Sequence, residues 1–178
     1  MDDGTKTLSS TRCETIPIEL FDDQESAPDA TTSYTDSITS SSLYYRDFAS
    51  STTSTVSVQW NAPPDFDVTS ITAVVGTFIS SATGPDGEGV AWHIAGCTNV
   101  DNTAWGCTPG EFYGAASVFG TSTQYAFVQS SKTEPIGIPD IAPGKKVILT
   151  LSRAVDAPID DYAQKVGAVE LNICYNIN

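Results

Sequence analysis

The residues best suited to chemistry in this sequence are four cysteines, one histidine, several acid pairs and a set of large aromatic side chains. Cys97 and Cys107 bracket the loop TNVDNTAWG, a span that can close as a disulfide-stapled hairpin in oxidising surroundings. With Cys13 and Cys174 included, three pairings are possible, and four free thiols are the alternative if the protein stays reduced. No C-x-x-C pair is present, so the usual zinc and redox motifs are excluded.

His93 and the acid pairs are the remaining candidates for catalysis or metal binding. His93 is the only histidine, it lies on the opposite face of its strand from Trp92 and Ile94, and no G-x-S-x-G motif frames a serine. Paired carboxylates suit calcium or glycoside hydrolysis, but none of these pairs lies in a D-x-D-x-D-G loop. We therefore predict that the protein is not an enzyme, with no catalytic residue, metal or cofactor. The acids concerned are Asp22 with Asp23, Asp65 with Asp67, and Asp156 with Asp160 and Asp161.

Aromatic side chains offer a different chemistry, because a flat ring can stack on the apolar face of a sugar. Aromatic residues within strands are usually core, so Trp105, which falls in a loop, is the best candidate. Asn99, Asp101 and Asn102 are near it in sequence and could bind hydroxyl groups, which makes this loop a possible glycan site. The full set of candidates for a stacking platform is Trp60, Trp92, Trp105, Tyr113 and Tyr125.

Alternating hydrophobic residues predict the elements that must position these groups. Val147, Leu149 and Leu151 share one side of a strand, and a second such series runs from Val169 to Ile177. Loops with proline and glycine or aspartate separate the runs, and no long helix is credible. The sequence predicts an all-β, jelly-roll-like antiparallel sandwich of about eight strands. We expect strands near Leu43–Ala49, Thr55–Trp60, Ile71–Ile79, Val90–Ile94, Glu111–Phe119, Thr123–Gln129, Lys145–Ser152 and Val166–Ile177.

Residues 1–42 differ from residues 43–178, which form the expected sandwich. They are rich in serine, threonine and aspartate and hold nine acids against Lys6 and Arg12. We interpret them as an extended acidic arm with one strand-like segment that docks on a sheet edge. Its docking residues would be Ile16, Ile18, Leu20 and Phe21. Arg46 and Arg153 are the expected ion-pair partners of the acidic links, within the subunit or between subunits.

Charge and hydropathy limit the partners. A formal net charge of −14 would repel a phosphate backbone, so nucleic acid is not expected as a partner. No apolar run approaches the roughly 20 residues of a membrane helix. The first residues, MDDGTKTLSSTRC, lack the layout of a signal peptide. We expect neither a membrane partner nor an export signal of its own.

From Tyr44 onward the order of features resembles the β-sandwich domain of tailed-phage virion proteins. The matching segments are YYRDFA, VSVQWNAPPDF and VILTLSRAVDAPIDDYAQKVGAVELNICY, whereas the insert CTNVDNTAWGC departs from that pattern. The resemblance covers about three quarters of the chain. It implies a structural or attachment role, often as a trimer, and it carries over no active-site residue.

The sequence thus favours a virion structural protein: a capsid decoration (cement) protein or a short head fibre. We expect a homotrimer whose arm binds a major capsid protein or another virion protein. It would assemble in the host cytoplasm and lie on the particle surface. Two alternatives stay open: a carbohydrate-binding or adhesion module that uses the Trp105 loop, and an extracellular filament whose subunits donate a strand to one another.

Overall fold

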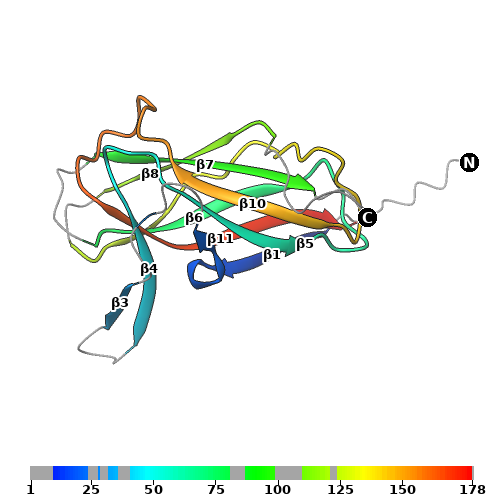
Figure 1. Cartoon of the computed structure of the whole chain (residues 1–178), viewed down its shortest axis with the longest axis horizontal. Coiled ribbons are helices and arrows are strands. Elements are labelled where there is room, and N and C mark those ends of the chain that lie inside the picture. Colours follow the sequence, from blue (N-terminus) through cyan, green and yellow to red (C-terminus); the bar gives the residue numbers. More distant parts are fainter. Residues whose placement is uncertain are drawn as a thin grey trace, which may run out of the picture.

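The computed structural model describes residues 10–23, 28, 32–35, 41–80, 87–98, 110–120 and 124–177. These residues form two antiparallel sheets that pack face to face as an elongated sandwich, with one hairpin projecting from it (Figure 1). The only helical element among them is the 3₁₀ turn η1 (Ile18–Leu20). The predicted all-β, jelly-roll-like sandwich is confirmed.

Sheet A is built around the last strand, β11 (Val166–Ile177). One side of β11 pairs with β6 (Thr72–Phe78), and β9 (Phe127–Gln129) continues beyond β6. The other side is shared, because β4 (Ser42–Phe48) pairs with the start of β11 and β1 (Ser10–Pro17) with the rest. β3 (Thr32–Thr35) pairs with β4 in the projecting hairpin (Figure 1).

Sheet B is built around β10 (Lys146–Arg153), which lies between β5 (Thr55–Asn61) and β7 (Gly89–Thr98). The short β2 (Asp22–Asp23) pairs with β5, and β8 (Tyr113–Val118) pairs with β7. Each of the eight expected strand regions contains a strand of the structure. The remaining strands, β1, β2 and β3, come from the segment expected to be an arm.

The core lies between the two sheets and is built from alternate residues of each strand, as the pleat requires. Val147, Leu149 and Leu151 are all fully buried, as their spacing predicts. The alternation in β11 predicts that Val169 faces the same side as Leu171 and Ile173, and this is wrong. A register shift between Ala168 and Glu170 moves Val169 to the outer face of sheet A, where it packs on Tyr45 and Phe78.

The arm segment is integrated into the sandwich of its own chain. Ile16, Ile18 and Phe21 belong to the main core cluster, whereas Leu20 is 63% exposed. The expected strand ends at Pro17, and the 3₁₀ turn that follows directs Ile18 inward and Leu20 outward. Strand addition to a sheet edge is found here within one chain. Docking of these side chains on another protein stays a prediction, and it would require their removal from this core.

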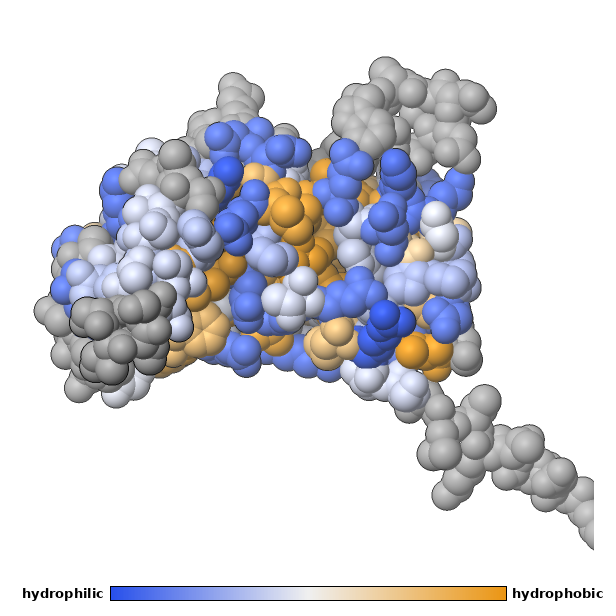
Figure 2. Space-filling view, turned by 90° about the horizontal axis from the view of Figure 1, so that it is seen from below, coloured by the Kyte–Doolittle hydropathy of each residue, from blue (hydrophilic) through white to orange (hydrophobic). Residues whose placement is uncertain are grey.

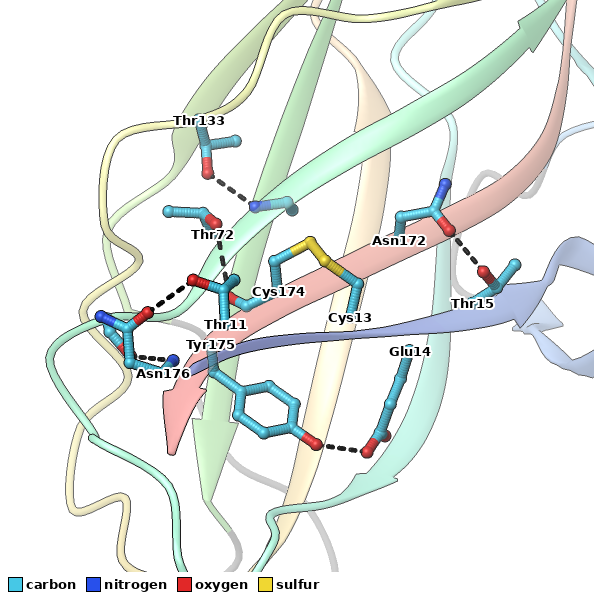
Figure 3. Close-up of a disulfide and its surroundings, with 12 residues drawn as sticks. Thr11, Cys13, Glu14, Thr15, Thr72, Thr133, Asn172, Cys174, Tyr175 and Asn176 are labelled. Atoms are coloured by element: carbon cyan, nitrogen blue, oxygen red, sulfur yellow. Dashed lines mark hydrogen bonds between the residues drawn. A yellow bond between two sulfur atoms is a disulfide. The ribbon is translucent and has the colours of Figure 1, made fainter. Parts of the chain in front are cut away.

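Three kinds of contact hold β1 on β11 (Figure 3). Cys13 and Cys174 are directly opposite each other, with their Cα atoms 4.1 Å apart, and form a disulfide. Thr15 Oγ1 donates to Asn172 Oδ1 at 2.6 Å and Thr11 Oγ1 to Asn176 Oδ1 at 3.0 Å. On the inner side, Glu14 accepts hydrogen bonds from Trp60 Nε1 at 2.9 Å and from the Tyr175 hydroxyl at 2.5 Å.

Arg153 fixes the acidic link between β10 and β11. Its side chain is fully buried and pairs with Asp160 at 2.6 Å, and it also donates to the carbonyl oxygens of Tyr162 and Gln164. Asp160 also accepts from the Ala91 amide. Arg46 pairs with Asp23. Both arginines thus have an acidic partner within the subunit.

Candidate binding surface on the outer face of sheet A

An aromatic cluster covers one end of the outer face of sheet A. We call it the aromatic surface, and it is built by the hairpin β3–β4, by β6 and by the segment that leads into β9. The rings of Tyr34 and Tyr125 stack with centroids 4.3 Å apart and planes 20° apart. The ring centroid of Phe78 lies 6.0 Å from that of Tyr125 and 5.0 Å from that of Tyr45. The members are Tyr34, Tyr45, Phe78, Tyr125 and Phe127.

Two glycines leave room for these rings on the sheet. A Cβ atom at Gly167 would come 2.9 Å from the Tyr45 ring. A Cβ atom at Gly76 would come 3.1 Å from the Phe127 ring and 2.7 Å from Cγ of Glu170. Glycine at these positions therefore lets aromatic side chains lie flat on a strand surface. It also places the Phe127 ring directly beside the Glu170 side chain.

The aromatic surface is only partly used for packing. Phe78 and Tyr45 are buried, but Tyr125 and Phe127 are each 45% exposed. Tyr125 has a φ of 69°, in the left-handed region that a bulky residue seldom adopts. Its amide donates to the carbonyl oxygen of Ile79 at 2.9 Å, which holds the backbone there. Strained residues with exposed side chains are typical of binding sites.

Polar side chains continue the same face along β11 and β1. Alternate residues of β11 point outward: Glu170 is opposite Pro17 of β1, and the next three meet a threonine, a cysteine and a threonine of β1 (Figure 3). Asn172 Nδ2 donates to Glu170 Oε1 at 2.9 Å, and Thr15 donates to Asn172. We call this row the polar ladder. Its members are Glu170, Asn172, Thr15, Thr11 and Asn176.

The surroundings of Tyr45 in the aromatic surface favour its protonated form. Burial raises the pKa of the Tyr45 hydroxyl, and the negative charge of Asp47 and the nearby Tyr125 raise it further. A protonated phenol can donate as well as accept a hydrogen bond. The surface thus presents apolar ring faces, phenol donors and, beside Phe127, the carboxylate of Glu170.

Of the aromatic residues that the sequence suggested for stacking and that the structure describes, only Tyr125 takes part in this surface. Trp60 and Trp92 are buried in the core, where Trp92 Nε1 donates to Thr77 Oγ1 at 3.0 Å. Tyr113 is half-buried and packs against the core cluster. Trp105 and its neighbours Asn99, Asp101 and Asn102 lie outside the described residues, so the loop site stays a prediction. Tyr34 and Phe127 were missed, because they meet only through the pairing of β3 with β4 and of β9 with β6.

The cysteine, histidine and acid candidates have other surroundings. Cys97 is disulfide-bonded, but its expected partner Cys107 lies outside the described residues. His93 is half-buried and stacks on Phe112 at 5.5 Å. Asp67 accepts from the amide and hydroxyl of Thr69, and Asp161 accepts from the Gly89 amide. Among the described residues, no group of three or more His, Cys, Asp and Glu side chains is placed to hold a metal ion.

Exposed hydrophobic side chains are concentrated in patches. Seen from below the view of Figure 1, hydrophobic residues reach the surface in a band across the middle, between hydrophilic margins (Figure 2). An open groove of about 200 Å³ lies over β7 and β8, lined mostly by small apolar residues with Ile159. His93 and Ser131 are its main polar groups. No helix in the described part of the chain is long and apolar enough to span a membrane.

Comparison with known proteins assigns the chain to no family. No protein-family model matches it, and no curated protein matches. Two solved structures align with nearly all of it. One belongs to a study of the promiscuous specificity of carbohydrate-binding modules from the β-sandwich superfamily (TM-score 0.37, 9% identity, 98% of this chain). The other is the family 11 carbohydrate-binding module from Clostridium thermocellum, in complex with a β-1,3-1,4-mixed-linked tetrasaccharide (TM-score 0.40, 8% identity, 97% of this chain).

The alignments cover 57% of the first structure and 92% of the second. At this level of likeness they do not bear on the ligand or partner of this chain. Nothing in these comparisons supports the resemblance to tailed-phage virion proteins.

Proposed function

We propose that this protein is a non-catalytic binding module that holds carbohydrate on the aromatic surface of sheet A. The observation that carries the proposal is the half-exposed Tyr125 ring, stacked on Tyr34 and held in a strained backbone conformation, on the same surface as Phe127. Ring faces attract the apolar faces of sugars, and the polar side chains next to them satisfy the sugar hydroxyls. This surface replaces the Trp105 loop as the main site of the proposal.

Packing of the hairpin on sheet A is the competing explanation of the same rings. It accounts for Phe78 and Tyr45, which are buried. It does not account for the exposed halves of Tyr125 and Phe127, which lie beyond the hairpin contact. A structural role predicts that truncating either ring lowers stability alone, and a binding role predicts that it lowers affinity.

The test compares binding to a panel of polysaccharides, by affinity electrophoresis, for the full chain and for Tyr125→Ala and Phe127→Ala. We expect both variants to lose about ten-fold or more in affinity, equivalent to about 1.4 kcal/mol. Phe112→Ala is the matched control, since Phe112 is a similarly exposed ring (54%) outside the aromatic surface, stacked on His93 of β7 in sheet B. Equal binding by all four proteins, or loss of binding only in Trp105→Ala, would contradict this assignment.

A second candidate function is that of an assembly subunit, such as a capsid decoration protein or head fibre on a virion surface. The observation that favours it is the hairpin β3–β4, which projects from the body and carries Tyr44, 46% exposed (Figure 1). The exposed Cys13 of the disulfide suits a protein outside the reducing cytosol in either case. Light scattering of the full chain tests it: a trimer that becomes a monomer in Tyr44→Asp supports assembly through the hairpin, and a monomer in both opposes it.

The donor-strand filament has less support than either candidate. The strand that would be donated, β1, is covalently bound to β11 of its own sheet through Cys13–Cys174.

A further inference from the structure

The aromatic surface and the polar ladder are parts of one continuous face. Gly76 joins them, because the side chains of Phe127 and Glu170 both lie over it. From Glu170, the outward residues of β11 follow at every second position to Asn176. At about 3.4 Å per residue, the ladder adds roughly 20 Å to the site.

The ladder has the chemistry of a surface for sugar hydroxyl groups. Thr15 and Thr11 each donate one hydrogen bond to an asparagine of β11. Each hydroxyl oxygen keeps acceptor capacity, and the amide nitrogen of an asparagine has two donors. Thr11 and Thr15 are exposed, and Asn172 and Asn176 are half-buried. The row therefore offers donors and acceptors beside the stacking rings, in two groups on either side of the Cys13–Cys174 disulfide.

An open face of this kind favours a polymer over a single sugar. A monosaccharide on a flat surface contacts protein on one side only, whereas small-molecule sites bury most of their ligand. A chain that lies along β11 gains contacts with each further unit, and later units bind at a high effective concentration. Affinity should therefore rise with chain length until the ligand reaches Asn176.

Charge selects among polymers. The carboxylate of Glu170 is in the middle of the face, and the whole chain has a net charge of −14. Two basic side chains are the nearest to Glu170 along β1 and β11. Arg12 of β1 pairs with Glu14, and Lys165, just before β11, is about 17 Å from Glu170 along the chain. A uronate or sulfate group over Phe127 would meet a like charge, whereas a neutral hydroxyl would donate to that carboxylate.

We infer that the site extends from the aromatic surface along the polar ladder and takes a chain of an uncharged polysaccharide, with Glu170 as the residue that excludes anionic polymers. This inference rests on the proposed carbohydrate-binding function.

Calorimetry with neutral disaccharides and hexasaccharides of the cello-, xylo- and manno- series tests the extent of the site. We expect a hexasaccharide of one series to bind about ten-fold more tightly than its disaccharide. Thr11→Val with Thr15→Val, which removes two hydroxyls with little change of shape, should weaken the hexasaccharide several-fold and leave the disaccharide unchanged. Tyr125→Ala should weaken both. Gln59→Ala, at an exposed position of β5 in sheet B, is the control.

Polygalacturonate tests the charge selection. The full chain should not bind it at low salt, and Glu170→Gln, which keeps an acceptor oxygen but loses the negative charge, should acquire measurable binding. Equal affinities for both chain lengths, or binding of polygalacturonate by the unaltered chain, would overturn the inference and leave the proposed function standing. If no sugar binds at all, the proposed function fails and the inference falls with it.

Discussion

The hydroxyl of Tyr175 donates to Oε1 of Glu14 at 2.5 Å, in the buried layer between the end of β1 and the last strand. Burial and the negative charge of Glu14 raise the pKa of Tyr175 from 10.0 to about 12. Between these two values the folded protein holds a proton that the unfolded chain has released. The free energy of unfolding should therefore fall as pH rises through this window, by up to roughly 2–3 kcal/mol.

Urea unfolding at several pH values from about 9 to about 12 measures this effect. Tyr175→Phe is the control, because it removes the hydroxyl and keeps the ring among Trp60 and Phe66. The variant should show a clearly shallower loss of stability over the window. A variant with the same pH dependence as the unaltered protein would show that other groups cause it. Tyr45 and Tyr162, whose pKa values are also raised, supply the residual slope.

The Cys13–Cys174 disulfide should be a major source of stability. It joins residues 161 positions apart and so removes much of the freedom of the unfolded chain. We expect Cys13→Ser with Cys174→Ser to lower the free energy of unfolding by roughly 2–5 kcal/mol in non-reducing urea titrations. Because Cys97 is also disulfide-bonded, reductant added to this double variant reports on that second bond alone. Unchanged midpoints would mean that β1 is held by its hydrogen bonds.

The Arg153–Asp160 pair should behave as a coupled unit. Their side chains are 0% and 2% exposed, so removing one charge leaves the other buried without its partner. Arg153→Leu or Asp160→Asn alone should cost roughly 3–5 kcal/mol of stability. In a double-mutant cycle, Arg153→Leu with Asp160→Asn should cost clearly less than the sum. Strict additivity would show that the two residues act independently.

The two glycines beneath the aromatic surface should differ when replaced by alanine. At Gly76 the new Cβ meets flexible side chains, Glu170 and Phe127, that can swing outward. Gly76→Ala should therefore change stability by less than about 1 kcal/mol but weaken glycan binding. At Gly167 the clash includes Cβ of Tyr45 at 3.2 Å, which cannot rotate away, so Gly167→Ala should cost about 1–3 kcal/mol. Thermal melts beside the binding assay separate the two effects, and similar melts for both variants would contradict this reading.

The strands of the sandwich were predictable because their information is local. Alternation in the segments around Leu149 and Ile173, with proline and glycine between them, is a property of short windows of sequence. The segment at Ile18 and Leu20 was misread for the same reason. Its alternation resembles a strand, but the chain turns after Pro17, and only the tertiary packing decides which side chains are buried.

The candidate site was less predictable because it is assembled from several strands of sheet A that are far apart in the sequence. Tyr34 and Tyr125 are 91 positions apart (125 − 34) and meet only after hairpin and sheet have formed. The pairing of Cys13 with Cys174 depends likewise on the register of the first strand against the last. Neither the Tyr34–Tyr125 contact nor the Cys13–Cys174 pairing can be predicted from the spacing of residues along the chain. A single aromatic residue could be suspected, as Tyr125 was, but its neighbours could not.

The disulfide between the middle of β1 and the C-terminal part of β11 also has a mechanical consequence. Tension applied to the chain before Cys13 and after Cys174 passes directly from one sulfur to the other, and the residues between them form a closed covalent ring that bears none of it. The sandwich should therefore keep its fold under pulling forces that unravel an unbridged β domain strand by strand. A module joined at both ends within a longer chain should therefore keep its ligand-binding face intact while that chain is under tension.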